Sequence, residues 1–512
     1  MKLYAALARG LADHGVDTVF GLLADPTMLF ADSFVRSEGG TFVSATHEAG
    51  ATHMGYGYQA ISRRLGVVCV DHGPGLMNSL TAVVDAVKAR APMLLIYPDT
   101  AVEEKHYRQN VPQRDLLLPT GAGFEPVRSP RTVLEDLAVA IRRAQFERRP
   151  VALNVPREYM AADVDYQRLV LDPVSMPKPA VDGESLDRAV GIIATARRPV
   201  VLVGRGAVAA RAELLCLAER IGAPLATTLG GKDLFRGEPF DLGIMGTLSH
   251  GTTLDIVAEA DCIISFGAGL NQDTTVKGSM LTGKRVVRCD IDPERLTAFA
   301  NCNAMILGDA AEVAATVVDW LDTGDIPTSA FRTPKMAERL AAQAAHRPTP
   351  APTAPGTVDF RTAIRAIDEL VPRDRIYVND IGRHITVTWP EVHVQSPHDF
   401  VLTGHVGAIG TGMGIAVGAG CADRSRPVLM VGGDGGFMLG GMGDFNSAVR
   451  HGIDLIAVIC NDGAYGPEHQ KFVEWGMPPS LVEFDWPDLG QVAEALGGVG
   501  ITVRNEEDLS AA

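Results

Sequence analysis

Val431-Gly-Gly-Asp-Gly-Gly-Phe437 is the stretch of sequence from which the fold can be worked out. It closes an apolar run at residues 427–431 and precedes a helix-like run at residues 444–450. Asn461 lies 27 residues after Asp434, just past the end of the next apolar run. One strand–helix–strand unit has this length, so we expect Asp434 and Asn461 to emerge side by side at the carboxyl ends of neighbouring parallel strands.

The residue types at this turn are those of a site for a metal ion and a phosphate group. A carboxylate at Asp434, an amide oxygen at Asn461 and a carbonyl at Gly463 make half of a hard-oxygen shell, which suits Mg²⁺. Gly435 and Gly436 let backbone N–H groups approach a diphosphate at the start of the following helix. The alternative is that the glycines form only a tight turn and that Asn461 caps a strand.

The same alternation of strand-like and helix-like runs extends along the whole chain. Short β-branched runs between periodic segments indicate parallel strands that are covered on both faces. The predicted strands lie at residues 66–71, 92–98, 150–155, 199–204, 262–266, 285–290, 375–379, 427–431 and 454–459. Proline-rich passages at 172–182 and 347–355 separate three blocks of similar size. We therefore predict an α/β protein of three doubly wound parallel-sheet domains, at residues 1–170, 183–325 and 357–512.

Composition excludes several classes of protein. With 46 basic and 62 acidic residues, the 512-residue chain has a formal charge of −16, which disfavours nucleic acid or an anionic membrane as a partner. An apolar fraction of 46% excludes intrinsic disorder. The seven cysteines form no C-x-x-C pair and the chain opens on an amphipathic run, so a cytoplasmic location is expected. Residues 400–422 hold no Asp, Glu, Lys or Arg, but their seven glycines favour a buried segment over a membrane span.

Gly433-Asp-Gly435 followed by Asn461-Asp-Gly463 resembles the thiamine diphosphate (ThDP) motif of the pyruvate decarboxylase and acetolactate synthase superfamily. The resemblance extends over nearly the whole chain and implies a pyrimidine-binding, a central and a diphosphate-binding domain, in that order. It implies ThDP and Mg²⁺ as cofactors. It also implies a homodimer or homotetramer, in which ThDP lies between the pyrimidine-binding domain of one chain and the diphosphate-binding domain of another.

The resemblance predicts a catalytic glutamate early in the chain, and Thr46-His-Glu-Ala-Gly50 supplies Glu48. In this family that glutamate hydrogen-bonds the aminopyrimidine ring and promotes loss of the proton at thiazolium C2. The role needs a buried carboxylate that exchanges a proton near neutral pH. The structural alternative is an acidic residue in the first turn of a helix, where the helix dipole favours it.

Three further segments resemble cofactor-contacting segments of acetolactate synthases. Gly73-Pro-Gly-Leu-Met-Asn78 matches a loop that faces the cofactor, and Asp380-Ile-Gly-Arg-His384 places His384 near the diphosphate. Gly407-Ala-Ile-Gly410 matches the segment whose large apolar residue, here Ile409, wedges under ThDP. Apart from the resemblance, Ile409 is interpreted as an ordinary core residue.

Other residues are candidates for handling protons or facing the substrate. Asn461-Asp-Gly-Ala-Tyr-Gly-Pro-Glu468 resembles the decarboxylase segment Asn-Asp-Gly-Tyr-Thr-Ile-Glu, which suggests Tyr465 as a cofactor contact and Glu468 as a relay. Asp25 follows a decarboxylase-like Phe-Gly-Leu, and His106 lies where decarboxylases carry paired histidines, although an exposed loop histidine fits as well. His72 follows a predicted strand directly and is a candidate to face the substrate.

The resemblance implies decarboxylation of a 2-oxo acid, with ThDP as the electron sink. The resulting enamine attacks a carbonyl acceptor, as in acetolactate synthases, or takes up a proton, as in simple decarboxylases that release an aldehyde. Of these two outcomes we prefer the acetolactate synthase-like carboligase, and the decarboxylase stays open as the alternative. The expected partners are small molecules, a 2-oxo acid and a carbonyl acceptor.

Two other classes of protein, an NAD-dependent oxidoreductase and a non-catalytic scaffold, fit the sequence less well. Residues 204–209 read G-x-G-x-x-A after a strand, a dinucleotide fingerprint of NAD-dependent oxidoreductases, but no ribose-binding acid follows at the expected distance. A non-catalytic scaffold is disfavoured because Glu48, Asp434 and Asn461 occur together. FAD is not expected, because residues 267–272 lack the Arg-Phe-Asp-Asp-Arg pattern of FAD-dependent relatives.

Overall fold

The computed structural model describes residues 1–172, 178–298, 302–347, 350 and 353–511. Parts of both proline-rich passages, and Ala512, lie outside the described residues. The chain divides into two compact units. Unit 1 consists of Met1–Met176, Thr353–Thr388 and Val401–Ala512, and unit 2 consists of Pro177–Pro352 and Trp389–Phe400.

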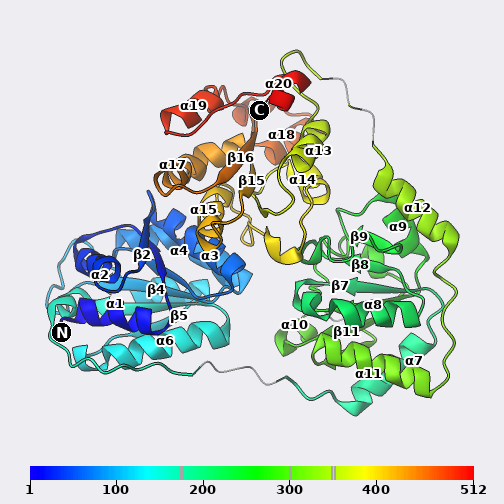
Figure 1. Cartoon of the computed structure of the whole chain (residues 1–512), viewed down its shortest axis with the longest axis horizontal. Helices are drawn as coiled ribbons and strands as arrows, with labels where there is room; N and C mark the ends of the chain where they lie inside the picture. Colours follow the sequence, from blue (N-terminus) through cyan, green and yellow to red (C-terminus); the bar gives the residue numbers. More distant parts are fainter. Residues whose placement is uncertain (173–177, 299–301, 348–349, 351–352, 512) are drawn as a thin grey trace. The chain divides into compact units, whose positions relative to one another are not determined.

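Unit 1 begins with a parallel sheet of six strands in the order β2-β1-β3-β4-β6-β5 (Figure 1). The strands are β1 (Thr18–Gly21), β2 (Thr41–Ser44), β3 (Gly66–Cys69), β4 (Met93–Asp99), β5 (Gly123–Pro126) and β6 (Pro150–Pro156). The helices are α1 (Leu3–Asp13), α2 (Asp25–Arg36), α3 (Glu48–Ser62), α4 (Pro74–Ala89), α5 (Gln113–Leu117) and α6 (Val133–Glu147). Figure 1 shows α1 and α6 on one face of this sheet and α3 and α4 on the other.

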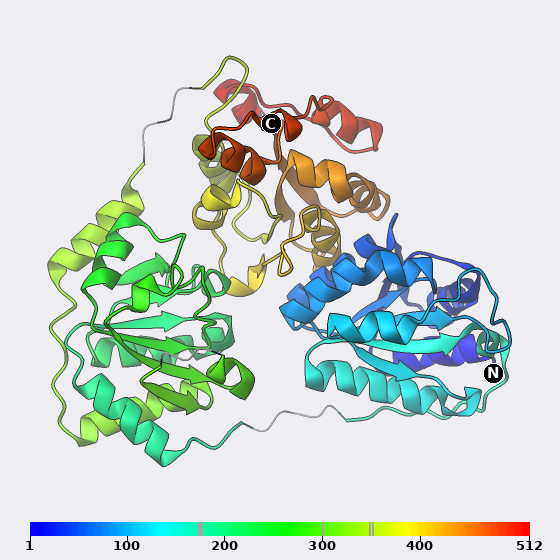
Figure 2. The ribbon, with the colours of Figure 1, turned by 180° about the vertical axis from the view of Figure 1, so that it is seen from behind.

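Unit 2 contains a second parallel sheet of six strands, in the order β12-β11-β10-β7-β8-β9. The strands are β7 (Pro199–Val203), β8 (Leu225–Thr227), β9 (Asp241–Ile244), β10 (Cys262–Phe266), β11 (Arg285–Asp290) and β12 (Ala304–Leu307). The helices are α7 (Gly183–Ala194), α8 (Arg211–Arg220), α9 (Gly251–Glu259), α10 (Pro293–Thr297), α11 (Ala310–Thr323) and α12 (Pro334–Ala345). Two separate apolar clusters pack on its two faces, and Figure 2 shows the sheet between its helical layers.

The third sheet has four strands in the order β14-β13-β15-β16, and β13, β15 and β16 run parallel. The strands are β13 (Ile376–Asn379), β14 (Phe400–Val401), β15 (Val428–Gly433) and β16 (Leu455–Cys460). The helices are α13 (Phe360–Leu370), α14 (Ile385–Glu391), α15 (Gly412–Ala422), α16 (Asp434–Gly436), α17 (Met442–Arg450), α18 (Gly466–Glu474), α19 (Leu489–Ala495) and α20 (Glu506–Ala511).

The predicted fold class is confirmed, because each of the three blocks contains a parallel sheet with helices on its faces. All nine predicted strands are present, and they are β3, β4, β6, β7, β10, β11, β13, β15 and β16. The sequence analysis missed seven strands, β1, β2, β5, β8, β9, β12 and β14, each of which has only two to four residues. Strands this short stand out in the sequence only where they belong to a longer apolar run, as the four-residue β3 does in residues 66–71.

The uncharged stretch at residues 400–422 is buried only in part, because residues 404–410 are partly buried or exposed. It ends in α15, whose residues 412–420 are all buried. No helix among the described residues is long and apolar enough to cross a membrane.

The first and third sheets belong to one unit because they share one apolar core. A single cluster of buried side chains includes residues of α3, of β3 and β4, and of β13, β15 and α15. Glycines let α3 and α15 meet backbone to backbone. A Cβ added at Gly57 would lie 2.0 Å from the Ile415 carbonyl oxygen, and one added at Gly418 would lie 1.8 Å from that of Met54.

Asp444 of α17 lies against this helix pair and is 4% exposed. Its carboxyl oxygens occupy the space where a side chain on Gly50 or Gly414 would be, 2.3 Å and 2.6 Å from the added Cβ atoms. Burial raises the pKa of Asp444 to about 7. The carboxyl group is therefore held in its protonated form over much of the acidic range.

Gly418 offers a direct test of the helix contact. Gly418→Ala must push α3 and α15 apart, and we expect it to lower the free energy of unfolding by about 1–3 kcal/mol. Urea denaturation followed by circular dichroism measures the change. Gly191→Ala in α7 is the matched control, because nothing lies within 4 Å of a Cβ added there, and it should stabilise by up to about 1 kcal/mol. Equal midpoints for the two variants would contradict the close packing.

The raised pKa of Asp444 predicts a dependence of stability on pH. The unfolded chain releases this proton near the ordinary pKa of 3.8, whereas the folded protein keeps it until about pH 7. The free energy of unfolding therefore falls as pH rises from about 4 to about 7. Asp444→Asn should remove this contribution, so the variant gains stability relative to the wild type across that interval. Denaturation at several pH values measures the difference, and a constant difference would refute the assignment.

Candidate active site

The turn that follows β15 places Asp434 at the start of a helical run. Asp434 is 2% exposed and opens α16, which continues into α17 through a π-helical turn. A Cβ added at Gly435 would lie 2.7 Å from the Tyr465 ring, and one added at Gly436 would lie 2.6 Å from Asp380 Oδ2. Both positions therefore require glycine, and the bare backbone of this turn lines a cavity.

Asp434 and Asn461 lie side by side, as their spacing predicted. The register of β15 and β16 pairs Gly433 with Cys460, so the next residue of each strand emerges at the same edge of the sheet. Asp434 Oδ2 and Asn461 Oδ1 both accept a hydrogen bond from Gly463 N–H, at 2.9 and 3.1 Å. The two side-chain oxygens therefore lie beside the same backbone N–H at this edge of the sheet.

Gly463 makes this convergence possible, because its φ of +64° turns the chain back toward the two side chains. Its carbonyl oxygen accepts a hydrogen bond from Phe484 N–H at 2.7 Å and keeps a second lone pair. No group of three or more His, Cys, Asp or Glu side chains in the described part of the chain could hold a metal ion. A cation here would depend on carboxylate, amide and carbonyl oxygens, the ligands that Mg²⁺ takes together with water and phosphate.

Negative charge at this edge is only partly compensated. Burial raises the pKa of Asp434, and the neighbouring charge of Asp462 raises it further. Asp462 also forms an ion pair with Arg383. The ionised form of Asp434 is therefore destabilised by burial and by the charge of Asp462. A divalent cation bound to Asp434 would offset this unfavourable energy. The donor set and its charge thus fit Mg²⁺.

His384 lies beside the same turn. Its ring is buried, its Nε2 lies 3.0 Å from the Asp380 carbonyl oxygen, and its Nδ1 lies 3.5 Å from a Cβ added at Gly433. Burial lowers the pKa of His384 to about 4. The imidazole is consequently neutral at pH 7. Because its Nε2 donates to the Asp380 carbonyl oxygen, its Nδ1 carries no proton and can only accept a hydrogen bond next to the turn.

Loop 402–410 brings the predicted Ile409 to the cavity wall, together with Gly407, whose φ is +81°. Asp380 holds the end of this loop, because its Oδ2 accepts a hydrogen bond from Gly410 N–H at 2.8 Å. Burial raises the pKa of Asp380 to about 6. The carboxyl group is thus hydrogen-bonded to the loop backbone. The loop packs closely on the turn, because a Cβ added at Gly410 would lie 2.9 Å from the Gly436 carbonyl oxygen.

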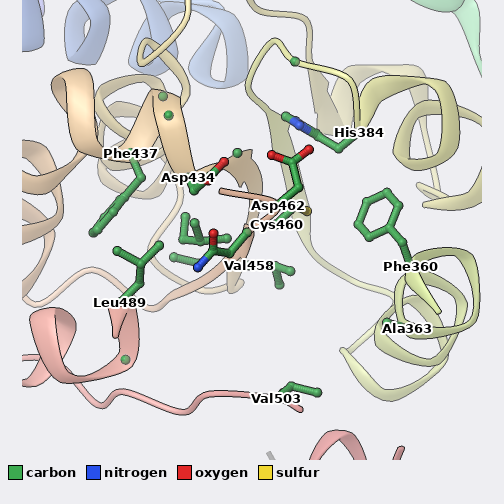
Figure 3. Close-up of a pocket in the computed structure, with 18 of the residues that line it drawn as sticks. Phe360, Ala363, His384, Asp434, Phe437, Val458, Cys460, Asp462, Leu489 and Val503 are labelled. Atoms are coloured by element: carbon green, nitrogen blue, oxygen red, sulfur yellow. The ribbon is translucent and has the colours of Figure 1, made fainter. Parts of the chain in front are cut away.

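The cavity has a volume of about 1510 Å³ and a polar and an apolar part. In the view of Figure 3, His384, Asp434 and Asp462 lie in the upper half, and Leu489 and Val503 lie in the lower half. The edge strand β16 forms part of the apolar wall and is only partly buried. The lining of the cavity includes most of the predicted cofactor residues, namely His384, Gly407, Ile409, Asp434, Gly435, Gly436, Asn461 and Tyr465.

Two cavity residues were missed by the sequence analysis. Arg383 lies within a matched motif, next to His384, and presents a guanidinium group to the cavity. Trp486 stacks on Phe484, and its buried indole N–H approaches Asp434 without completing a hydrogen bond to any described residue. Position within the motif could have indicated Arg383. No sequence motif indicates Trp486, because its position at the cavity depends on the stacking of its ring on Phe484.

Glu48 opens α3 and is partly buried, and its Oε2 accepts a hydrogen bond from Asn78 Nδ2 at 3.0 Å. A Cβ added at Gly75 would lie 3.5 Å from Glu48 Oε1, so the absence of a side chain there keeps this oxygen accessible. All described residues that line the large cavity fall within 356–509, so Glu48 is not among them.

The remaining candidates lie in different surroundings. His72 is 1% exposed, its Nδ1 lies 2.7 Å from Asp71 Oδ1, and its Nε2 has no hydrogen-bond partner among the described residues. Asp25 begins α2 and is exposed, and His106 is exposed in a loop. Glu468 is exposed in the first turn of α18 and lines the cavity. The structure thus brings only Glu468 of these four to the cavity.

The glycines of the dinucleotide-like run serve close packing within unit 2. A Cβ added at Gly204 would lie 2.2 Å from the Gly267 carbonyl oxygen, and one added at Gly206 would lie 3.1 Å from Gly267 Cα. The residues that follow form a 3-10 helix, Arg205–Ala210, before α8 begins. The run is therefore explained by the contact between two loops.

Comparison with known proteins finds the same family in all three blocks. Residues 1–118 match the model of the thiamine pyrophosphate enzyme N-terminal TPP binding domain, residues 186–317 the central domain, and residues 380–512 the C-terminal TPP binding domain. Together the three matches cover most of the chain.

Curated relatives align over nearly the whole chain. A sulfoacetaldehyde acetyltransferase of Rhodobacter capsulatus is 28% identical, over 100% of this chain and 91% of the relative. An acetolactate synthase large subunit of Parasynechococcus marenigrum is 28% identical, over 99% and 85%. A probable 2-ketoarginine decarboxylase of Pseudomonas aeruginosa is 28% identical, over 98% and 89%. With its three family domains in order, the chain belongs to the thiamine pyrophosphate enzymes.

Proposed function

We propose that this enzyme uses ThDP and Mg²⁺ to decarboxylate a 2-oxo acid and transfers the remaining acyl unit to a carbonyl acceptor. The observation that carries the proposal is the convergence of Asp434 and Asn461 on one point beside the glycine turn 433–436. Transfer of the acyl unit is preferred over release of an aldehyde because, of the three relatives described above, one is named for acetyl transfer and one for acetolactate synthesis, whereas one is named as a decarboxylase.

ThDP would supply an electron sink for the loss of CO₂. Asp434 and Asn461 would hold the cation that accompanies the diphosphate, with the Gly463 carbonyl as a third oxygen. Arg383 and the bare backbone of Gly435 and Gly436 would bind the phosphate oxygens. His384 would present only a hydrogen-bond acceptor, because its pKa of about 4 keeps the ring neutral and its Nε2 already donates to the Asp380 carbonyl oxygen.

Glu48 is proposed as the proton-exchanging carboxylate. The hydrogen bond from Asn78 orients its Oε2, which leaves Oε1 to take up or release a proton. Because no described residue before 356 lines the cavity, we infer that Glu48 acts on a cofactor held by a second copy of the chain. This inference supports a homodimer or homotetramer with active sites between chains.

Release of an aldehyde after uptake of a proton is the second candidate function. One observation favours it, because Glu468 lines the cavity with an exposed carboxyl group, which lies 3.6 Å from Lys471 Nζ. Asp25, His72 and His106 remain proposed as groups that face the substrate or relay a proton. The exposed Asp25 and His106 would depend on surfaces that a second copy brings together.

Product analysis by proton NMR tests the reaction. The protein is incubated with ThDP, Mg²⁺ and pyruvate, and in a second sample with a larger aromatic 2-oxo acid, each with and without an added aldehyde acceptor. We expect consumption of the 2-oxo acid and formation of a new C–C bond. Glu48→Gln should lower kcat by about 100-fold or more, since it removes the proton-exchanging group. Free aldehyde as the only product would favour the second function, and full activity of Glu48→Gln would refute the mechanism.

Removal of Asp434 tests the metal site. Asp434→Ala should weaken ThDP binding about 100-fold at saturating Mg²⁺, or about 2.7 kcal/mol, because one charged ligand of the cation is lost. Isothermal titration calorimetry measures the affinity. Asp488→Ala is the control, because Asp488 lines the same cavity but caps α19, and its affinity should stay within about twofold. Unchanged affinity in Asp434→Ala would exclude Asp434 from the metal site.

A further inference from the structure

Loop 402–410 makes hydrogen bonds with residues of the N-terminal TPP binding domain as well as with Asp380. The Tyr56 hydroxyl of α3 donates a hydrogen bond to the Leu402 carbonyl at 2.8 Å, and it lies 3.0 Å from His405 Nε2. Asp85 Oδ1 of α4 accepts a hydrogen bond from Val406 N–H at 2.9 Å. Two helices of the first block thus hold a loop of the third block through its backbone.

Both anchoring side chains are deeply buried. Tyr56 is 4% exposed and Asp85 is 1% exposed. The rings of Tyr56 and His405 meet edge to face, with centroids 5.9 Å apart. Asp85 Oδ2 has no hydrogen-bond partner among the described residues, and burial raises the pKa of Asp85. A buried carboxyl group with an unpartnered oxygen lowers stability. For Asp85, the hydrogen bond from Val406 N–H is the interaction that offsets part of this cost.

We propose that Tyr56 and Asp85 are positioning residues that set Ile409 for the cofactor. The proposal rests on the proposed function, in which Ile409 supports ThDP. Loop 402–410 is in direct contact with the diphosphate turn, because a Cβ added at Gly410 would lie 2.9 Å from the Gly436 carbonyl oxygen. A shift at the anchored end of the loop therefore changes the cavity wall beside Asp434.

The same two helices also position Glu48. This residue begins α3, eight residues before Tyr56, and its partner Asn78 precedes Asp85 by seven residues on α4. Two turns of helix thus separate each anchor from the proton-exchanging site. The α3–α4 pair therefore ties the proton-exchanging carboxylate and the loop of Ile409 to one rigid element.

Hydrogen exchange of the cofactor-free protein tests the anchoring alone. We expect the peptide that contains residues 402–410 to exchange about tenfold faster in Asp85→Ala, which loses a hydrogen bond to a charged acceptor, and faster by a smaller factor in Tyr56→Phe. Asp85→Asn keeps an acceptor oxygen and should restore slow exchange. Tyr58→Phe is the matched control, because Tyr58 is also 4% exposed on α3 but donates to Asp17. Unchanged exchange in both anchor variants would overturn the proposal.

ThDP titration of the same variants tests the consequence for the cofactor. Asp85→Ala and Tyr56→Phe should weaken ThDP binding by about tenfold and threefold, whereas Asp85→Asn and Tyr58→Phe should stay within about twofold of the wild type. Faster loop exchange without weaker binding would overturn the link to the cofactor. Failure of the wild type to bind ThDP would instead overturn the proposed function. If Asp85→Ala does not fold, Tyr56→Phe alone decides the test.

Discussion

The backbone contact between α3 and α15 is the constraint on which the rest of unit 1 depends. Only glycine at residues 57 and 418 allows the two helices to approach so closely that any side chain would overlap a carbonyl oxygen. The contact seals one apolar core across two sheets. It also orients α3, whose first residue is Glu48, against the helix that follows loop 402–410. The two glycines thus help to determine where the candidate catalytic residues lie.

Near this contact the protein buries several aspartate side chains. Burial raises the pKa of Asp380, Asp434 and Asp444 alike, but the three groups differ in what balances them. Asp380 is satisfied by loop backbone, and Asp434 faces a cavity in which a cation and a diphosphate would complete its surroundings. Asp444 lies against Gly50 and Gly414 of the two helices, and its buried carboxyl group makes stability depend on pH. Equal burial therefore leads to different roles, depending on what each carboxyl group faces.

The motif in the sequence and the geometry of the site agree closely in the third block. Consecutive parallel strands of one βαβ unit must place their following residues at one edge, so a spacing of 27 residues was enough to predict that Asp434 and Asn461 meet. The convergence of both on Gly463 N–H could not be predicted, because it depends on a left-handed turn. Trp486 illustrates the same limit, since aromatic stacking brings it to the cavity from a loop without periodicity.

The first block shows where reasoning from motifs ends. Glu48 was identified by resemblance, but its partner Asn78 and the free space at Gly75 are consequences of how α3 and α4 pack. His72 follows its strand directly, as predicted, and yet it is enclosed, because Asp71 and Tyr107 cover its ring. Sequence adjacency places a side chain at a strand end, but the neighbouring loops decide whether it reaches solvent.

By itself the sequence determined the fold class, the strand order within the βαβ unit of β15 and β16, and the residues of the candidate metal site, because hydrophobic period and spacing are local properties. Only the tertiary structure decided that the first and third blocks form one unit, that the glycines of 204–206 serve packing, and that Tyr56 and Asp85 hold loop 402–410. These contacts join residues that lie far apart in the sequence, and no local pattern encodes them. They arise from burying one shared core, in which shape and backbone hydrogen bonds choose the partners.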